Sequence, residues 1–287
     1  MSSLTVLDRL TLAGRLDKPN DDAMGAAGAV AFVLDGATGL GDTPLMPAES
    51  DAAWVAHAAS EALAKHAHGF AGDLDSLVLK ATQDVKAEFD ATRLRNDYAA
   101  YEIPWATLAM CGVTLGRLNI AFLGDSRLLV RDENGVVHHF GAPLIYRKSE
   151  QKLAAEMIAN AKGAVLGVEA QRATVLPKLR ASRERVNTPE GYWLIGPDPR
   201  AAAHVVKSHL KIGSGAMALL MTDGFYALTE DYKVYDDAGL IEAAIKKGLD
   251  VLGHELREIE GDDPYGHKYP RMKQSDDATA MLVRIES

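Results

Sequence analysis

VAFVLDG, at residues 30–36, is an apolar run that stops at a carboxylate, Asp35. Two other runs end in the same way: IAFLGD at 120–125 stops at Asp125, and ALLMTD at 218–223 stops at Asp223. Runs of four or five apolar residues bounded by Gly and Asp are typical of buried strands. We therefore expect each of these acids to stand where a strand of the core meets the surface.

Two further acidic stretches, NDDA at 20–23 and SDDAT at 275–279, lie near the two ends of the chain. Carboxylates that gather at one place repel one another and raise each other's pKa, and divalent cations compensate such a cluster. The four carboxylates of Asp22, Asp35, Asp223 and Asp276 match the charge of two divalent ions, and these stretches contain no His or Cys. Ligation by oxygen alone favours Mg²⁺ or Mn²⁺ over Zn²⁺.

Paired ions of this kind have a definite chemistry. Two such ions about 4 Å apart share a water molecule, lower its pKa and direct it at a phosphorus atom. The sequence thus predicts metal-assisted hydrolysis of a phosphoester, in which the four Asp residues act through metal-bound water.

In order and spacing, these motifs resemble those of the metal-dependent PPM, or PP2C-type, protein Ser/Thr phosphatases. The chain has the acidic pair followed by Ala at 20–23, the Asp-Gly at 35–36 and an intact Gly-Asp-Ser-Arg at 124–127. The Thr-Asp-Gly at 222–224 and the terminal DDAT at 276–279 complete the series, so the resemblance spans residues 8–286.

The resemblance implies the ligands of each ion. Asp35, Asp223 and Asp276 would hold one metal, and Asp35 would bridge to the second. The second ion would be reached by the backbone carbonyl of Gly36 and by Asp22, acting partly through water. Gly suits that position because the backbone can approach an ion with no Cβ in the way.

Two more acids carry implied roles. Asp21 occupies the neighbouring acid of the family, and Asp125 matches the carboxylate that holds an optional third metal in some members. The implied fold is α+β, a four-layer α-β-β-α sandwich of two antiparallel sheets flanked by helices. Because one site would draw ligands from position 22 to position 276, we expect residues 1–287 to form a single phosphatase domain.

The chain departs from the family pattern at three places. Ala37 stands where well-known members carry a His proposed as general acid, a contribution typically worth about 10²- to 10⁴-fold. Asp17 stands where the family often places an Arg that grips phosphate, and Arg15 or Lys18 are the candidate substitutes. Ala227 replaces a second Asp of the third metal site. The pattern predicts an intact two-metal core with altered accessory groups.

Composition limits the other functions open to the chain. It has 287 residues, of which 47% are hydrophobic, which is ample for a core. The net charge of −9 lacks the basic character of a nucleic-acid binder, so we expect no nucleic-acid partner. No apolar run approaches the length of a membrane span and no signal peptide is visible, which favours a cytoplasmic protein without a membrane partner. The single cysteine, Cys111, is expected to be a thiol of the core.

The hydrophobic pattern predicts runs of strands interrupted by helices, which indicates α+β. The expected helices cover residues 50–67, 74–95, 150–161 and 238–260. The expected strands cover residues 4–14, 26–34, 105–115, 117–124, 126–132, 135–140, 191–195, 216–222 and the segment after 279. Residues 162–190 are poorly patterned, either a flap over the site or a solvated excursion, and the Pro/Gly-broken loop at 261–274 is expected beside the site.

We expect a Mn²⁺- or Mg²⁺-dependent phosphatase with a signalling role, acting on phosphoserine or phosphothreonine in a phosphorylated protein substrate. The protein substrate follows from the resemblance alone. Two alternatives stay open. One is a phosphatase of small phosphoesters, and the other is a catalytically silent binding or regulatory module, which Ala37, Asp17 and Ala227 favour.

Overall fold

The structure is a computed structural model that describes residues 3–141, 168–271 and 273–286. Within them, the strands form two antiparallel sheets of five strands each. In spatial order, the first sheet contains β1 (Ser3–Leu12), β10 (Ala278–Glu286), β9 (Met217–Met221), β6 (Arg127–Arg131) and β7 (Val137–Gly141). The second contains β2 (Asp22–Ala27), β3 (Val30–Gly36), β4 (Ala106–Thr114), β5 (Arg117–Leu123) and β8 (Val206–Lys211).

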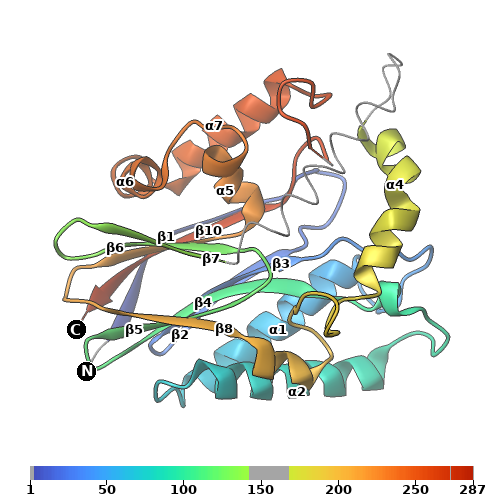
Figure 1. Cartoon of the computed structure of the whole chain (residues 1–287), viewed down its shortest axis with the longest axis horizontal. Coiled ribbons are helices and arrows are strands. Elements are labelled where there is room, and N and C mark those ends of the chain that lie inside the picture. Colours follow the sequence, from blue (N-terminus) through green and yellow to red (C-terminus); the bar gives the residue numbers. More distant parts are fainter. Residues whose placement is uncertain (1–2, 142–167, 272, 287) are drawn as a thin grey trace.

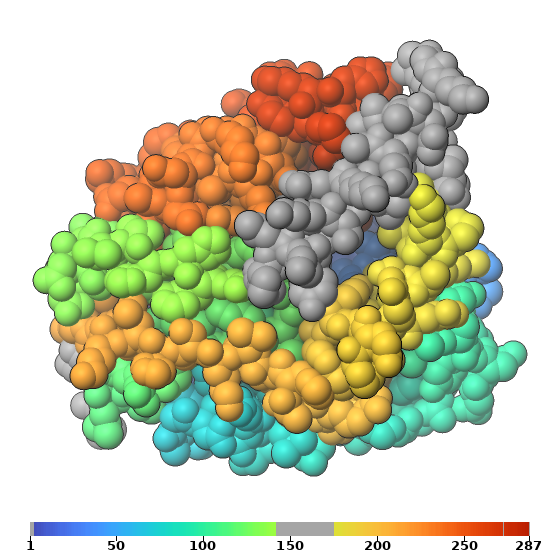
Figure 2. Space-filling view, viewed as in Figure 1, coloured from blue at the N-terminus to red at the C-terminus, as the bar shows by residue number. Residues whose placement is uncertain are grey.

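Helices cover the outer face of each sheet (Figure 1). On the second sheet lie α1 (Asp51–Ala67) and α2 (Leu74–Thr92), and on the first lie α5 (Asp223–Glu230), α6 (Asp237–Lys247) and α7 (Leu249–Asp262). A further helix, α4 (Val168–Arg183), lies to one side of this stack, as Figure 1 shows, and the 3₁₀ turn η1 (Ala100–Glu102) contacts α4. The 3₁₀ turn η2 (Pro199–His204) packs against α2. Figure 2 shows the same layers as successive bands of colour. The predicted four-layer α-β-β-α sandwich is confirmed.

The apolar run at residues 30–34 is buried on both of its faces. Phe32 and Leu34 pack toward α1 and α2, whereas Ala31 and Val33 point into the space between the sheets. Side chains alternate along a strand, so a strand buried on both faces reads as a continuous apolar run. The next residue of the inward-facing set is Asp35, which therefore lies at the end of the space between the sheets.

The predicted helix starts in the first half of the chain are confirmed. The Ser50 hydroxyl caps α1 and accepts from the backbone N–H of Ala52 at 3.1 Å and of Ala53 at 3.4 Å. Asp73 caps α2 in the same way, directly before residue 74, at which that helix was expected to begin. Ser and Asp are favoured there because their oxygens satisfy N–H groups that the helix leaves open.

One predicted strand, at 26–34, is wrong. It is a hairpin of β2 and β3, joined by a turn in which Gly28 has φ 58°. A residue without Cβ enters that left-handed region freely, so Gly28 turns the chain inside what reads as one apolar stretch. The hairpin places Asp22 opposite Asp35 in register, a pairing that a single strand would not give.

The second half of the chain departs further from the prediction. The helix expected at 238–260 is two helices, α6 and α7, divided at Gly248 with φ 86°. The strand expected at 191–195 is a single bridge between Ile195 and Ala106. Three elements were not predicted, namely α4, α5 and β8. The helix expected at 150–161 lies outside the described residues, and no helix within them is long and apolar enough to cross a membrane.

Cys111 is fully buried in β4, as predicted, and burial raises the pKa of its thiol to about 12. Thiol reagents attack the thiolate, which this environment suppresses. The folded protein should therefore fail to react with dithionitrobenzoate at pH 8, whereas the protein in guanidinium chloride should release one equivalent of thionitrobenzoate. Rapid release from the folded protein would contradict this burial.

Candidate metal centre and active site

The predicted acids meet at one end of the space between the two sheets. Asp22 is the first residue of β2, opposite Asp35 in β3 of the same sheet. Asp223 stands two residues after the end of β9 of the other sheet, and Asp276 stands two residues before β10. A hydrogen bond joins the two sides, because the hydroxyl of Thr222 donates to Asp22 Oδ2 at 2.9 Å. Two residues 200 positions apart in the chain thus share one side-chain contact.

The electrostatics of Asp35 show how closely the acids gather. Burial first, and then the charges of Asp223, Asp22, Asp276 and Asp125, in that order, raise the pKa of the Asp35 carboxyl well above its usual range. The structure therefore brings the five carboxylates within electrostatic reach of one another. Like charges held together in this way favour protonation unless a cation offsets them.

Two carboxylate oxygens at the site fit a cation. Asp21 Oδ1 and Asp22 Oδ1 are buried and have no hydrogen-bond partner. Burial raises the pKa of Asp22 well above its usual range against the hydrogen bonds of Thr279 and Thr222, and burial likewise raises the pKa of Asp21. Leaving a buried acceptor unsatisfied is costly. A hard divalent ion satisfies such oxygens and removes the cost, so the donor set fits Mg²⁺ or Mn²⁺.

The carboxylates do not form a closed cage of ligands. Among the described residues, no group of three or more His, Cys, Asp or Glu side chains already has the geometry of a metal site. A reason is visible at Asp276, whose Oδ1 accepts from Lys273 Nζ at 2.5 Å and from the N–H of Asp277 at 2.9 Å. That carboxylate is engaged by the chain itself.

Asp277 organises the backbone around the site, a role that the sequence analysis did not assign. Its Oδ1 accepts from the N–H of Gly14 at 2.7 Å, and its Oδ2 accepts from the N–H of Asp21 at 2.7 Å. One carboxylate therefore ties the segment that follows β1 to the acidic pair before β2. The signal in the sequence was the second acid of the Asp276–Asp277 pair.

Two glycines permit the close packing of this region. A Cβ on Gly36 would lie 2.5 Å from the carbonyl oxygens of both Ala52 and Asp21, and a Cβ on Gly224 would lie 2.0 Å from the carbonyl oxygen of Asp277. Both contacts are with backbone, which cannot rotate away as a side chain can. The glycines of the two Asp-Gly pairs are therefore required by the approach of neighbouring chain segments.

Asp125 lies in the turn through which the chain crosses from β5 in one sheet to β6 in the other. Arg127 anchors this turn. Its side chain is fully buried, donates from Nη1 to the Asp125 carbonyl at 2.5 Å and forms an ion pair with Glu230 of α5 at 3.5 Å. Buried beside it, the hydroxyls of Thr107 and Ser126 are hydrogen-bonded at 2.6 Å. The intact Gly-Asp-Ser-Arg motif is thus mostly buried structure.

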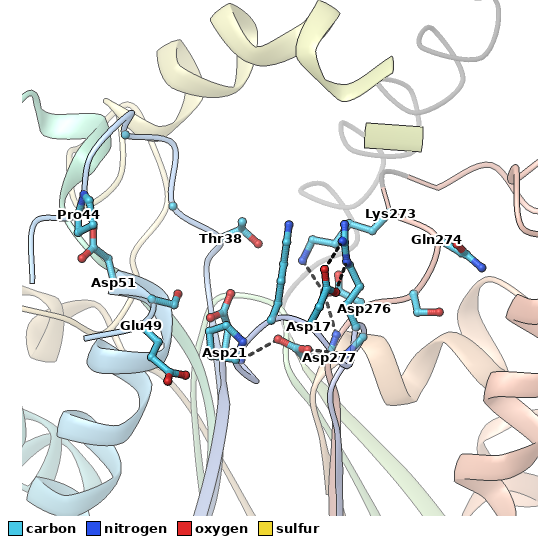
Figure 3. A pocket seen from close by; sticks show the side chains of 18 of the residues that line it. Asp17, Asp21, Thr38, Pro44, Glu49, Asp51, Lys273, Gln274, Asp276 and Asp277 are labelled. Atoms are coloured by element: carbon cyan, nitrogen blue, oxygen red, sulfur yellow. Dashed lines mark hydrogen bonds and ion pairs between the residues drawn. The ribbon is translucent and has the colours of Figure 1, made fainter. Parts of the chain in front are cut away.

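A pocket of about 1080 Å³ opens above the acids (Figure 3). Thr38, Asp51 and their loop form one wall, and Lys273 and Asp276 lie on the facing side. The loop at 261–274 does border the site, since Tyr265 also lines the pocket.

Both predicted phosphate-binding candidates, Arg15 and Lys18, line this pocket. Arg15 is engaged by Asp17, to which its Nε and Nη2 donate at 2.8 and 2.6 Å. That hydrogen bond holds the pKa of the exposed Asp17 carboxyl below its usual range, and the charges of Arg15 and Lys18 act in the same direction. Asp17, which stands where the family often has an Arg, therefore attracts Arg15 and Lys18, the two candidates to take over the role of that Arg.

Helix α4 packs over the loop that follows Asp35 and Gly36. Arg183 donates to the carbonyls of Ala37 and Thr38 at 3.3 and 3.4 Å, and Arg180 donates to the carbonyl of Leu40 at 3.0 Å. Helix α4, which is part of the poorly patterned residues 162–190, therefore supports one wall of the pocket.

Of the residues that depart from the family pattern, Ala227 is buried among the helices over the first sheet. It offers no ligand.

Comparisons with known proteins agree with this geometry. The family model described as Protein phosphatase 2C matches residues 14–243, a span that includes Asp22, Asp35 and Asp223 and ends before Asp276. A comparison of the sequence with curated proteins gives no significant match.

Several solved structures resemble the chain over nearly its whole length. The catalytic domain of the serine threonine protein phosphatase PstP, in complex with two manganese ions, has 16% identity and a TM-score of 0.57, with 100% of both chains covered. The PPM Ser-Thr phosphatase MsPP from Mycobacterium smegmatis, in complex with cacodylate, has 19% identity and a TM-score of 0.53 over 98% of this chain and 99% of that one. The serine/threonine phosphatase Stp1 from Staphylococcus aureus has 15% identity and a TM-score of 0.53 over 100% and 96%. At these identities the likeness concerns the fold.

Proposed function

The chain belongs to the protein phosphatase 2C family, and on that premise we propose that it hydrolyses phosphoserine and phosphothreonine esters in proteins with two divalent cations. The observation that carries the proposal is the convergence of acids from both sheets at one place: Asp22 lies opposite Asp35 in one sheet, and the hydroxyl of Thr222, the residue before Asp223, donates to Asp22. Since the proposed ligands come from positions 22 to 276, we also propose that residues 1–287 form one domain.

The residues of the site divide between two proposed ions. Asp35, Asp223 and Asp276 would hold one, and Asp22 with the Gly36 carbonyl would hold the second, which Asp35 also reaches. When bound, such ions supply a water molecule of lowered pKa and draw charge from the phosphoryl group. Asp22 is oriented for this by the hydroxyl of Thr222, which donates to it and makes no capping bond to its own helix, α5.

Neighbouring groups set the position of the remaining carboxylates. Asp277 fixes the backbone of Asp21, whose buried Oδ1 faces the same region. The main chain at Asp125 is held by Arg127, and we propose that Asp125 is the ligand of an optional third ion. Ala227 leaves that third site with one carboxylate fewer than the family pattern provides.

Manganese or magnesium is the proposed metal. All-oxygen ligation supports this choice, and the similar PstP structure contains two manganese ions. The substrate class is proposed from the family, whose description is that of a protein phosphatase.

Hydrolysis of p-nitrophenyl phosphate tests the proposed activity. The purified protein should release p-nitrophenol with millimolar Mn²⁺ or Mg²⁺, lose this activity on chelation and regain it when the ion is restored. The ion should also raise the melting temperature, because a ligand bound only by the folded chain adds about 2.7 kcal/mol of stability at a hundredfold excess over its Kd. Stabilisation by the metal with no turnover at any pH would instead identify a silent binding module.

Competition between substrates tests the proposed substrate class. Phosphopeptides containing phosphoserine or phosphothreonine should be hydrolysed with a higher kcat/KM than sugar phosphates or nucleotides. The reverse order would identify a phosphatase of small phosphoesters with the same metal centre.

A further inference from the structure

The pocket is lined by a lysine side chain to which neither the sequence pattern nor the family comparison assigns a role. Lys273 lines the pocket, and its Nζ lies 2.5 Å from Asp276 Oδ1, a proposed metal ligand. The side chain is one-third exposed, so its ammonium group is accessible from the pocket. Figure 3 shows it beside Asp276 on one wall, with Asp21 on the facing side.

We propose that Lys273 binds the phosphoryl group of the substrate, in place of the Arg that the family pattern puts at the position of Asp17. Its ammonium group pairs with Asp276, so a metal ion bound by this carboxylate would compete with the ammonium group for it. The inference deepens the function proposed above and rests on it.

The charge around Lys273 supports this role. Lys273 and Asp276 lie on one side of the pocket and Asp21 lies on the other, so the charge of the ammonium group acts on acids of both sides. Divalent ions bound by these acids would neutralise the carboxylates in place of the Lys273 ammonium group. The ammonium group would then lie next to the position where a dianionic phosphoryl group meets the ions.

The loop that carries Lys273 is held firmly. Asp263 accepts from the backbone N–H of His267 at 2.9 Å and of Tyr269 at 2.9 Å, and it pairs with Arg271 Nη1 at 2.9 Å. Arg271 also donates from Nε to the carbonyl of Gln274 at 2.8 Å. These contacts hold His267, Tyr269, Arg271 and Gln274 in place, while the four-carbon stem of Lys273 leaves its ammonium group able to change partner.

The other cations of the pocket are less well placed. Arg15 is held by two hydrogen bonds to Asp17, and the charge of Lys18 also acts on that exposed carboxylate. Asp17 is not a proposed metal ligand, so a metal ion at the proposed centre does not compete with Arg15 for that carboxylate. Lys273 differs because metal and ammonium group share Asp276, which makes its availability depend on the ion.

The test compares Lys273→Met, which keeps the length of the stem and removes the charge, with the conservative Lys273→Arg. Lys268→Met is the matched control, because Lys268 lies in the same loop, is exposed and packs over the ring of Tyr269. Arg15→Met and Lys18→Met test the rival cations. Each protein is assayed for the KM of p-nitrophenyl phosphate and, by calorimetry, for the affinities of Mn²⁺ alone and of phenylphosphonate in Mg²⁺.

For Lys273→Met we expect a rise of about tenfold or more in KM and in the Kd of phenylphosphonate, the loss associated with one hydrogen bond between charged groups. The affinity for Mn²⁺ should move in the opposite direction and tighten by about two- to fivefold, because a competing exposed ion pair is removed. Lys273→Arg should retain most of the phosphonate affinity, and Lys268→Met should behave as the unmodified protein.

A structural role for Lys273 would weaken the binding of metal and phosphonate together, and this result would overturn the inference. A change in KM confined to Arg15→Met or Lys18→Met would also overturn it. If the unmodified protein binds Mn²⁺ but hydrolyses no ester, the proposed function fails, and phenylphosphonate binding by the two Lys273 variants still decides the role of this residue.

Discussion

Asp35→Asn should lower the turnover of p-nitrophenyl phosphate by at least about 10²-fold and, at neutral pH, raise the melting temperature of the metal-free protein. The loss of rate follows because this carboxylate would contact both ions, and such ions supply several kcal/mol of transition-state stabilisation. The gain in stability follows from the raised pKa of Asp35, which burial and four neighbouring acids cause. Removing that charge removes both the cost of burying a carboxylate and its repulsion by the neighbouring acids.

The sign of the stability effect is fixed by the direction of the pKa shift. Because the folded-state pKa of Asp35 lies above its unfolded value, the folded chain binds a proton at this carboxyl more tightly than the unfolded chain does. Stability is therefore lost as the pH rises from about 4 through the folded-state pKa, unless metal is bound. Each kcal/mol that the variant recovers should raise the melting temperature by about 2–4 °C.

The matched control for Asp35→Asn is Asp97→Asn, an exposed acid away from the pocket. It should change neither turnover nor the melting temperature of the metal-free protein, and it should leave the stabilisation by Mn²⁺ intact. Asp35→Asn should abolish most of that stabilisation. A variant at Asp35 that keeps the full metal response would show that this carboxylate holds no ion.

Gly224→Ala should lower both the free energy of unfolding, by about 1–3 kcal/mol, and the rate of hydrolysis, by at least about tenfold. The added Cβ would lie 2.0 Å from the carbonyl oxygen of Asp277, so α5 and the segment before β10 must move apart. That movement separates Asp223 from Asp276, which flank the contact. Urea denaturation and steady-state kinetics measure the two effects.

Gly261→Ala supplies the comparison, because it is the same change in another helix, α7, and its Cβ would meet nothing within 4 Å. Alanine is favoured over glycine in helices, so this variant should gain up to about 1 kcal/mol and keep its activity. Equal effects at the two glycines would show that Gly224 is limited by helix propensity and not by contact with Asp277.

The sequence predicted many of the strands and helices because these leave short-range signals, whereas the four layers followed from the family resemblance. An apolar run that stops at Asp35 reports a strand buried on both faces, and Ser50 reports the first turn of a helix. The turn at Gly28 escaped notice because the residues on either side of it are small and apolar, so two strands read as one. Gly248 was missed in a similar way, since a single Gly inside a helical pattern does not by itself indicate a break.

The contacts around the site join residues that lie far apart in the sequence, so the sequence alone does not show them. Asp277 could be seen as an acid of the terminal motif, but its bonds to Gly14 and Asp21 join segments more than 250 residues apart. Lys273 stands three residues before Asp276, and nothing in its immediate neighbours distinguishes it from the other lysines of the chain. Only the folded chain shows which cation shares a carboxylate with the proposed metal.

The ion pair of Arg127 and Glu230 joins β6 of the first sheet to the end of α5. Arg127 begins β6 and Glu230 ends α5, whose first residue is Asp223, so this contact holds one end of a helix that carries a proposed ligand at its other end. We expect a substitution at Glu230, remote from the pocket, to shift α5 and with it the position of Asp223. Variation along α5 is a means of adjusting catalysis without altering any group that touches the substrate.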